Sequence, residues 1–440
     1  MMRAHSWASC CRMRWSSRWR RGMAILRGGD PAGCGQGPSK DPAFRSWLFA
    51  IVLNKSRPVG RFSHCDQVRK RNVALFNRKE PILGVDISPS AVKLIELSRS
   101  GPRFRVEAFA IEPLGENTAA EDRHFVDADE AGAALKRAWR NSGARARRVA
   151  AAVPTSSVIT RIVPMPVEFK ESDIETNVPI EASQYIPYPI EEIYLDFEMR
   201  GRSPASADLQ DVMLVASRKE IVDMREEAIK SAGLVPAVVD VEAYALENTF
   251  RLLLGSLPSG GSDGKGISLA KERDSLTALV DIGAIFTNLY ILQEGRVIFT
   301  REQGFGSEQL TLRIMETYGL TRAQAEQAKR TGQISDDYGS VVLEPFKQML
   351  AEQIGHGLQF FFSSDQYVSG RYNVDTIVLS GGGAMIMGLD RVAADMLGIT
   401  TVIANPFKSM GSAAKVNSNA LLRDAPLLMV ACGLALRSFD

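Results

Sequence analysis

Residues 83–97 read LGVDISPSAVKLIEL, an apolar segment that ends in one acid, turns at Ser-Pro-Ser and becomes apolar again. Apolar runs on both sides of a turn predict two strands joined as a hairpin. Asp86 closes the first strand, and aspartate often caps turns through nearby backbone groups. Taken alone, this hairpin and its acid therefore indicate local structure only.

A second stretch repeats this pattern later in the chain. Residues 277–292 read TALVDIGAIFTNLYIL, and Val280-Asp281-Ile282 aligns with Val85-Asp86-Ile87 at an offset of 195 residues. Two similar hairpins at a fixed offset indicate an internal duplication. We therefore expect two similar lobes that present their acidic hairpins to each other.

Two such hairpins together suggest a phosphate site. A strand that ends at a tight turn frees backbone N–H groups, which bind anions. A carboxylate repels phosphate, so we expect Asp86 and Asp281 to act through Mg²⁺, which keeps part of its water shell. Lys93 would add direct countercharge. The hydroxyls expected to face phosphate oxygens are those of Ser88, Ser90 and Thr287.

A glycine-rich segment follows a predicted buried strand near the end of the chain. It reads Ser380-Gly381-Gly382-Gly383-Ala384 and precedes a predicted helix. Glycines there allow a backbone to approach a phosphate or a flat ligand, and a helix N-terminus adds partial positive charge. No P-loop or dinucleotide-binding glycine motif follows a strand, which excludes those two nucleotide-binding folds.

The two hairpins predict an α/β protein with two similar lobes, and the family resemblance given below implies that each lobe has a central mixed sheet flanked by helices and that a small subdomain is inserted into the first lobe. The expected parts are an extension (1–72), the first part of the first lobe (73–154), the inserted subdomain (155–235), a connecting helix of the first lobe (236–254), a linker (255–276), the second lobe (277–410) and a return to the first lobe (411–440).

Charge and cysteines divide the chain near residue 72. Residues 1–72 carry a net charge of +12, four of the five cysteines and no periodic pattern, whereas the remainder carries −10. We expect the extension to be disordered or not part of the native coding sequence; a basic arm is the alternative. The acidic remainder argues against nucleic-acid binding. Its single cysteine, Cys432, excludes disulfides and a zinc site there.

Eight segments between residues 82 and 440 together resemble a known family. They are LGVDISPSAVKLIEL, EASQYIPYPIEEIYLDFE, DVMLVASRKEIVD, AGLVPAVVDVEAYALEN, ALVDIGAIFTNL, GSEQLT, AEQAK and VLSGGGAMIMGLD. This set resembles the actin-like ATPase superfamily, and within it the PilM family of type IV pilus assembly proteins, which are related to FtsA. The resemblance implies an actin-like ATPase fold with an FtsA-like inserted subdomain, and ATP with Mg²⁺ in the cleft between the lobes.

The resemblance also implies roles for individual residues. LGVDIS and LVDIGAIFTN would be the two phosphate motifs, the second of which includes Gly283, Thr287 and Asn288. Glu326 and Lys329 match a ribose contact. The residues that match the adenosine motif are Gly381, Gly382, Gly383 and Ala384. An acid in VDVEAYA, Asp240 in preference to Glu242, would position the attacking water.

Members of this family hold the short cytoplasmic tail of the membrane protein PilN between the inserted subdomain and the first lobe. In the segment QYIPYP, four residues would line or support that groove: Gln184, Tyr185, Ile186 and Pro187. The alternative is that this segment is a helix end packed in the core. PilO-like proteins and an assembly ATPase are further expected partners, and a homo-oligomer is left open. We expect a cytoplasmic protein, peripheral at the inner membrane, that contacts the membrane only through a partner.

Two other functions within the superfamily compete with this hypothesis. One is a small-molecule kinase, which needs a positioned base and a polar substrate pocket. The other is an FtsA-like filament-forming division protein. Ile285 and Phe286 occupy the second hairpin turn where a polar, phosphate-gripping turn is expected. This departure favours ATP binding with at most slow hydrolysis.

Overall fold

The computed structural model describes residues 80–115, 127–204, 206–254, 275–332, 334–364 and 373–439. The predicted extension and almost all of the predicted linker lie outside these ranges. Ser275 and Leu276, expected in the linker, already belong to a strand, β9 (Ser275–Ile282).

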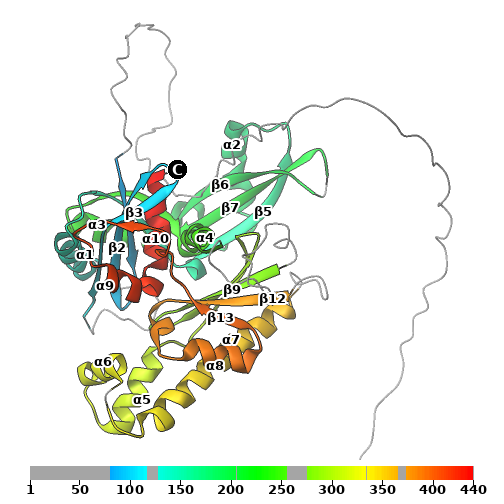
Figure 1. The fold of residues 1–440 in the computed structure, drawn as a ribbon. Helices are drawn as coiled ribbons and strands as arrows, with labels where there is room; N and C mark the ends of the chain where they lie inside the picture. The colour runs from blue at the N-terminus through cyan, green and yellow to red at the C-terminus, as the bar shows by residue number, and fades with distance from the viewer. Residues whose placement is uncertain are drawn as a thin grey trace, which may run out of the picture. The chain divides into compact units, whose positions relative to one another are not determined.

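The first lobe is built on a six-stranded mixed sheet with the order β14-β3-β2-β1-β4-β8 (Figure 1). β1 pairs antiparallel with β2 and parallel with β4, and every residue of β1 is buried. A strand covered on both faces is apolar throughout, which explains the run before Asp86. The strands are β1 (Ile82–Ile87), β2 (Ala91–Ser100), β3 (Arg103–Pro113), β4 (Arg148–Val153), β8 (Val235–Val241) and β14 (Gly411–Ser412).

Helices cover both faces of this sheet. On one face, α1 (Ala128–Ser142) and α3 (Lys219–Ser231) pack against Leu83 and Val85. On the other, α4 (Glu242–Leu253) and α10 (Met429–Leu436) share cores with the strands, while the short α9 (Ser418–Arg423) packs nearby. Because α10 is enclosed between β1, β2 and α4, its sequence MVACGLAL is apolar on all sides (Figure 1).

The second lobe repeats the strand order of the first. Its five-stranded sheet has the order β11-β10-β9-β12-β13, with an antiparallel β9-β10-β11 meander followed by two parallel strands. The same pattern runs through β3-β2-β1-β4-β8, so the predicted duplication is visible in the topology. The remaining strands are β10 (Thr287–Gln293), β11 (Arg296–Gln303), β12 (Asn373–Ser380) and β13 (Thr400–Ile403), and the helices are α5 (Glu308–Tyr318), α6 (Arg322–Thr331), α7 (Glu344–Phe362) and α8 (Leu389–Leu397).

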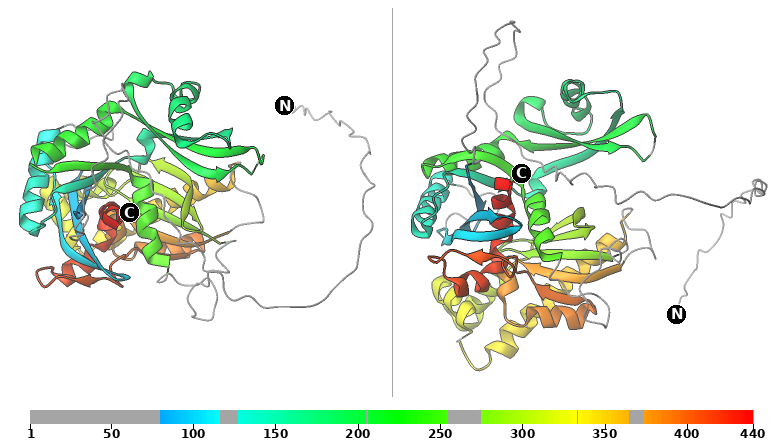
Figure 2. Two further views of the ribbon diagram at one scale, coloured as in Figure 1. Left: turned by 90° about the horizontal axis from the view of Figure 1, so that it is seen from above. Right: turned by 45° about the horizontal axis from the view of Figure 1, so that its top comes forward.

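A three-stranded antiparallel sheet of order β5-β7-β6 forms a separate unit between β4 and α3. It consists of β5 (Val158–Pro166), β6 (Ile193–Arg202) and β7 (Leu209–Arg218), and α2 (Glu171–Ala182) covers one face (Figure 2). Ile174, Val178 and Ala182 of α2 pack into its core. The expected inserted subdomain also included α3, but Ala228 and Ile229 of α3 lie in the first-lobe core instead.

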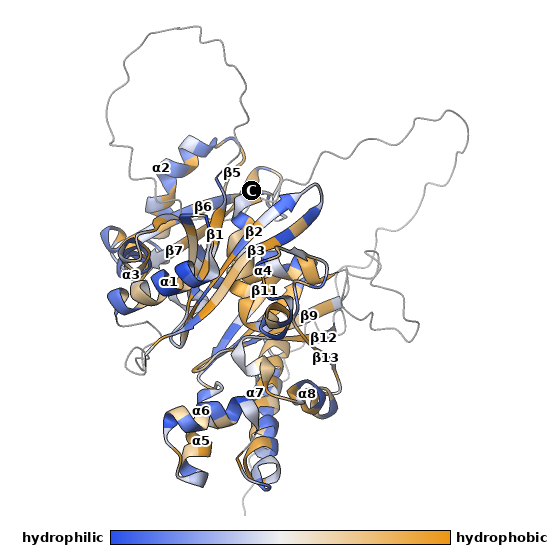
Figure 3. Cartoon of the chain, turned by 60° about the vertical axis from the view of Figure 1, so that its left-hand side comes forward, coloured by the Kyte–Doolittle hydropathy of each residue, from blue (hydrophilic) through white to orange (hydrophobic). Residues whose placement is uncertain are grey.

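Apolar residues are distributed as these layers require. α1, α3 and α5 carry both hydrophilic and hydrophobic residues, as helices do when one side packs on a sheet (Figure 3). Within the part of the chain that the structure describes, no helix has the length and hydrophobicity to cross a membrane.

Ile174 tests the core of the inserted sheet. Its side chain is fully buried, so Ile174→Ala is expected to reduce the free energy of unfolding by about 2–4 kcal/mol through lost burial and a cavity. Ile180, on the same helix, is 62% exposed, and Ile180→Ala should change stability by less than about 0.5 kcal/mol. Urea unfolding followed by circular dichroism measures both; equal losses would contradict the assigned packing.

Candidate functional site

The first acidic hairpin holds its acid in an ion pair. Asp86 is the penultimate residue of β1 and lies opposite Lys93 of β2 in the antiparallel register. Residues opposite each other on one sheet face have neighbouring side chains. Lys93 Nζ donates a hydrogen bond of 2.7 Å to Asp86 Oδ2, and both side chains are largely buried. The lysine expected to meet phosphate therefore neutralises the first acid in this structure.

The second acidic hairpin is supported from the neighbouring parallel strand. Asp281 is the penultimate residue of β9, opposite Asn288 of β10 and in register with Ser380 of β12. Ser380 Oγ donates a hydrogen bond of 2.9 Å to Asp281 Oδ1. The serine that begins the glycine-rich segment thus fixes the orientation of the second acid.

The charges of the two hairpins lie within electrostatic range of each other. Burial opposes the charged form of Lys93, but the carboxylates of Asp86, Asp281 and Glu242 outweigh it and raise the pKa of Lys93. Burial raises the pKa of Asp281, with Lys93 and Ser380 acting in the opposite direction. The structure therefore brings together the two acids predicted as metal ligands, although they belong to different sheets.

Glu242 is the third acid of this cluster. It is the first residue of α4 and follows β8 directly. Burial, together with the negative charges of Asp86 and Asp281, raises the pKa of Glu242 from 4.5 to about 8. Three carboxylates thus meet at the carboxyl ends of β1, β9 and β8, and a bound cation would favour their charged forms.

Asp240 does not join this cluster, although the sequence favoured it over Glu242. It is 1% exposed, and its Oδ2 accepts hydrogen bonds from Arg437 Nε at 2.8 Å and Nη2 at 2.5 Å. Its Oδ1 accepts the N–H of Val241 at 2.8 Å. The carboxylate of Asp240 thus serves a buried ion pair with the C-terminal segment, whereas that of Glu242 lies in the acid cluster.

The glycine-rich loop packs directly on the second hairpin. Gly381 has φ +80°, and a Cβ there would lie 2.4 Å from the carbonyl oxygen of Ile282 and 2.9 Å from Asp281 Oδ1. A Cβ on Gly383 would overlap the Ile282 side chain, whereas a Cβ on the exposed Gly382 would meet only Leu427 Cδ2, at 4.0 Å. Glycine is therefore required for the close approach at Gly381 and Gly383 but not at Gly382.

The helix expected after this loop begins later than predicted. Residues Gly382–Met385, which include Ala384, form a 3-10 turn, and α8 starts at Leu389. The loop therefore does not lead directly into an α-helix, and the partial charge of an α-helix N-terminus is not adjacent to it.

The predicted phosphate-facing hydroxyls make local bonds instead. Ser88 Oγ donates to the carbonyl of Ala91 at 2.8 Å, and Thr287 Oγ1 donates to the carbonyl of Phe305 at 2.6 Å. Ser90 is exposed, and its carbonyl accepts the N–H of Leu114. A role of Ser88 and Thr287 toward phosphate therefore requires that their hydroxyls leave these carbonyls.

The turn of the second hairpin caps α5. The carbonyls of Gly283 and Ala284 accept the N–H groups of Ser307 and Glu308 at 3.0 and 2.8 Å. The first N–H groups of a helix have no intrahelical partner, so this contact satisfies two of them. The turn of the second hairpin therefore caps the N-terminus of α5.

Glu326 and Lys329 form a compact polar network with α5. Lys329 Nζ donates to Glu326 Oε1 at 2.7 Å and to Thr311 Oγ1 at 2.8 Å, and Thr311 donates to Glu326 at 2.5 Å. Although burial acts in the opposite direction, Lys329 and these hydrogen bonds lower the pKa of Glu326. The pair is thus held in one geometry by its bonds to Thr311.

Residues 184–187 divide between core and surface. Ile186 is buried in the core of the inserted sheet, as the alternative interpretation held for this segment. Gln184 and Pro187 are exposed, and Tyr185 is 46% exposed with Arg161 6.0 Å from its ring centroid. Ile186 therefore anchors the segment while its neighbours present a surface.

The sequence analysis missed Arg225. This residue lies on α3 and is 2% exposed. Burial lowers its pKa to about 10, against the opposing charges of Glu242 and Asp86, so the guanidinium lies near the acid cluster. A signal was present, because Arg225 interrupts the apolar positions Ile221 and Ile229 at helical spacing.

The acid cluster fits one cation shared with a nucleotide. Among the described residues, no three His, Cys, Asp or Glu side chains are placed to hold a metal by themselves. Mg²⁺ commonly uses one or two carboxylates, several waters and substrate phosphates. Asp86 and Asp281 provide such a set, and the buried Glu242 beside them would be more easily ionised if a cation were bound.

Comparisons with known proteins agree with this architecture. The sequence profile of the family described as Type IV pilus assembly protein PilM matches residues 84–439. A solved PilM–PilN type IV pilus biogenesis complex is similar at 27% identity and a TM-score of 0.66, with 82% of this chain and 99% of that chain covered.

Two more distant structures are also similar. EutJ, an ethanolamine utilization protein from Carboxydothermus hydrogenoformans, has 15% identity and a TM-score of 0.47, with 81% and 89% coverage. MreB5 of Spiroplasma citri, solved with ADP, has 13% identity and a TM-score of 0.41, with 81% and 95% coverage.

The two duplicated lobes and the glycine loop beside paired strand-end acids define an actin-like ATPase fold, as predicted. Within that class, the chain belongs to the PilM family of type IV pilus assembly proteins.

Glu242 gives the protein without metal a defined pH dependence. Its pKa is about 8 in the folded protein against 4.5 in the unfolded chain, so the stability it contributes is complete below about pH 4.5 and is lost as the pH rises through 8. The amide side chain in the Glu242→Gln variant is neutral at every pH. Its stability relative to the parent should therefore rise between about pH 5 and pH 9, by on the order of 4 kcal/mol, because each unit of pKa difference corresponds to about 1.4 kcal/mol. Urea unfolding in EDTA measures this; a pH-independent difference would contradict the assigned environment.

Asp240 and Arg437 test the structural assignment. Arg437→Met leaves a buried carboxylate unpaired and is expected to cost about 3–5 kcal/mol, and Asp240→Asn should cost a similar amount. The double variant should recover part of the loss, which a double-mutant cycle by urea unfolding quantifies. Loss of ATP binding in Asp240→Asn with unchanged stability would instead place Asp240 in the nucleotide site.

Proposed function

We propose that this protein is a nucleotide-dependent scaffold of the type IV pilus inner-membrane platform, binding Mg-ATP between its lobes and the cytoplasmic tail of PilN at the inserted subdomain. The observation that carries the proposal is the convergence of Asp86, Asp281 and Glu242 beside the glycine loop. These groups lie at the carboxyl ends of strands, where open α/β sheets bind ligands.

The proposed site assigns roles to residues of both lobes. Asp86 and Asp281 would hold Mg²⁺ through water, and Lys93 would lie close enough to meet phosphate oxygens. When bound, Mg²⁺ would neutralise phosphate charge and the acids around it. Gly381, Gly382, Gly383 and Ala384 would contact the adenosine, and Glu326 with Lys329 the ribose. Glu242, in preference to Asp240, would orient a water.

Hydrolysis in this site would be slow at most. The hydroxyls of Ser88 and Thr287 donate hydrogen bonds to backbone carbonyls, and Lys93 forms an ion pair with Asp86. Fast phosphoryl transfer relies on preorganised groups aimed at the transferring phosphoryl. This arrangement supports retention of nucleotide over rapid turnover.

The partner proposal rests on family membership and on the surface of the inserted subdomain. The similar solved structure contains PilM together with PilN. Here Tyr185 and Pro187 are exposed on the inserted subdomain, on either side of the buried Ile186. The PilN tail would place this protein at the cytoplasmic face of the inner membrane, near PilO-like proteins and an assembly ATPase.

Nucleotide would influence PilN only by linkage. A ligand shifts an equilibrium between two lobe arrangements by its difference in affinity for them. If ATP favours the arrangement that binds the tail, the tail must strengthen ATP binding by the same factor.

Calorimetry tests the proposal with two ligands and two variants. Mg-ATP and a synthetic peptide of the cognate PilN cytoplasmic N-terminus are titrated separately into the protein. Asp86→Ala should weaken Mg-ATP binding by about tenfold or more, because it removes a metal-orienting carboxylate. Glu80→Ala removes an exposed acid just before β1 and should leave affinity unchanged.

Unchanged Mg-ATP affinity in Asp86→Ala would refute the assigned nucleotide site. Absence of peptide binding with and without Mg-ATP would refute the scaffold function.

A further inference from the structure

Thr155 lies where the three parts of the described fold meet. It follows β4 and Pro154, and it begins the short 3-10 turn (Thr155–Ser157) that leads into β5 of the inserted sheet. Its Oγ1 accepts the N–H of Ala243 at 3.0 Å and lies 3.3 Å from the hydroxyl of Tyr290. One hydroxyl therefore joins the entrance of the insert, the start of α4 and strand β10 of the second lobe.

Tyr290 brings the second acidic hairpin into this junction. It is 1% exposed and lies on β10, the strand that pairs with the Asp281 strand. A buried tyrosine hydroxyl usually needs a hydrogen-bond partner, and Thr155 is one. Burial raises the pKa of Tyr290 well above its ordinary value, with Glu242 and Asp281 acting in the same direction. The junction thus lies beside the acid cluster.

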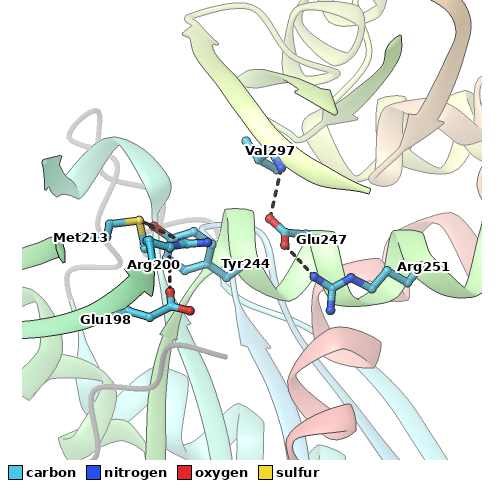
Figure 4. A network of polar contacts seen from close by, with 7 residues as sticks. All are labelled: Glu198, Arg200, Met213, Tyr244, Glu247, Arg251 and Val297. Carbon is cyan, nitrogen blue, oxygen red and sulfur yellow. Dashed lines mark hydrogen bonds and ion pairs between the residues drawn. The ribbon is translucent and has the colours of Figure 1, made fainter. Parts of the chain in front are cut away.

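The first two turns of α4 carry contacts to each part, and Figure 4 shows those that Tyr244 and Glu247 make. Glu242 belongs to the acid cluster, and Ala243 donates to Thr155. Tyr244 donates to Met213 Sδ of β7 in the inserted sheet at 3.8 Å. One turn later, Glu247 accepts the N–H of Val297 on β11 at 3.1 Å and also binds Arg251.

These contacts differ in what a change in lobe separation would do to them. Ala243 lies on α4 of the first lobe and Thr155 closely follows the first-lobe strand β4, whereas Tyr290 and Val297 belong to the second lobe. A movement of the second lobe would therefore lengthen or shorten the Thr155–Tyr290 contact, at the residue where the chain enters the insert. Hydrogen bonds weaken steeply when their geometry is distorted, so this contact is sensitive to the separation of the lobes.

We propose that Thr155 is a positioning residue that couples the nucleotide site to the inserted subdomain, by holding the Glu242 end of α4 and the entrance of the insert against Tyr290. The inference rests on the proposed function, because it needs both ligands. The inference adds how the nucleotide site is regulated: a change in the arrangement of the lobes alters the Thr155–Tyr290 contact and, through it, the partner surface of the inserted subdomain.

The test measures coupling, which a merely structural role would not change. The Kd of Mg-ATP is measured with and without saturating PilN peptide, and the ratio of the two is the coupling factor. Thr155→Val keeps the shape of the side chain and removes the hydroxyl. It should bring the coupling factor at least about fivefold closer to one, while each ligand's affinity alone changes less than about threefold.

Three further variants make the result specific. Thr155→Ser retains the hydroxyl and should keep the coupling factor of the parent. Tyr290→Phe should lose coupling as Thr155→Val does, and the double variant should lose no more than either single one. Thr176→Val, on an exposed position of α2, is the control and should behave as the parent.

The outcomes separate this inference from the function on which it rests. If the parent binds both ligands without coupling, or if Thr155→Val and Tyr290→Phe keep the coupling of the parent, the inference is wrong while the scaffold function stands. If the parent binds neither ligand, the proposed function fails, and the coupling role fails with it. If Thr155→Val unfolds, Tyr290→Phe tests whether the Thr155–Tyr290 contact carries the coupling, because it removes only the tyrosine hydroxyl.

Discussion

The electrostatic balance of the acid cluster is the constraint on which the site depends. Asp86, Asp281 and Glu242 occupy one region between two sheets, and Lys93 and Arg225 supply the positive charge. Burying like charges together is costly unless cations or protons offset them. The folded protein offsets the charge by pairing Lys93 with Asp86 and by raising the pKa of Glu242. A ligand that brings Mg²⁺ would satisfy the same charges and would also link the two lobes.

The duplicated topology explains how distant residues reach this region. In each lobe a meander of three antiparallel strands is followed by two parallel strands, and the acid is the penultimate residue of the strand that joins these two parts, β1 or β9. Because β12 runs parallel to β9, the glycine loop after β12 emerges beside Asp281. α4 then connects the first sheet to β11 of the second lobe through Glu247. The site and the connection between the lobes thus arise from the same strand ends.

The sequence predicted the features that local patterns encode. The paired hairpins, their acids and the glycine loop follow from short apolar runs and turn residues, and the fold and family follow from their order. Features that depend on long-range pairing were not predictable in this way. Asp240 and Glu242 are two residues apart, and only the contact with Arg437, 197 residues away, separates their roles. Likewise, whether Ser88 or Thr287 donates outward depends on which carbonyl its turn places nearby.

Hydrogen–deuterium exchange with and without Mg-AMPPNP tests the central claim, that two hairpins and the glycine loop hold one nucleotide between the lobes. The account predicts that saturating nucleotide slows exchange together in three segments: the turns at residues 87–91 and 283–287, and the loop at 381–385. Protection of only one of these segments, or protection elsewhere while the nucleotide is bound, would contradict it.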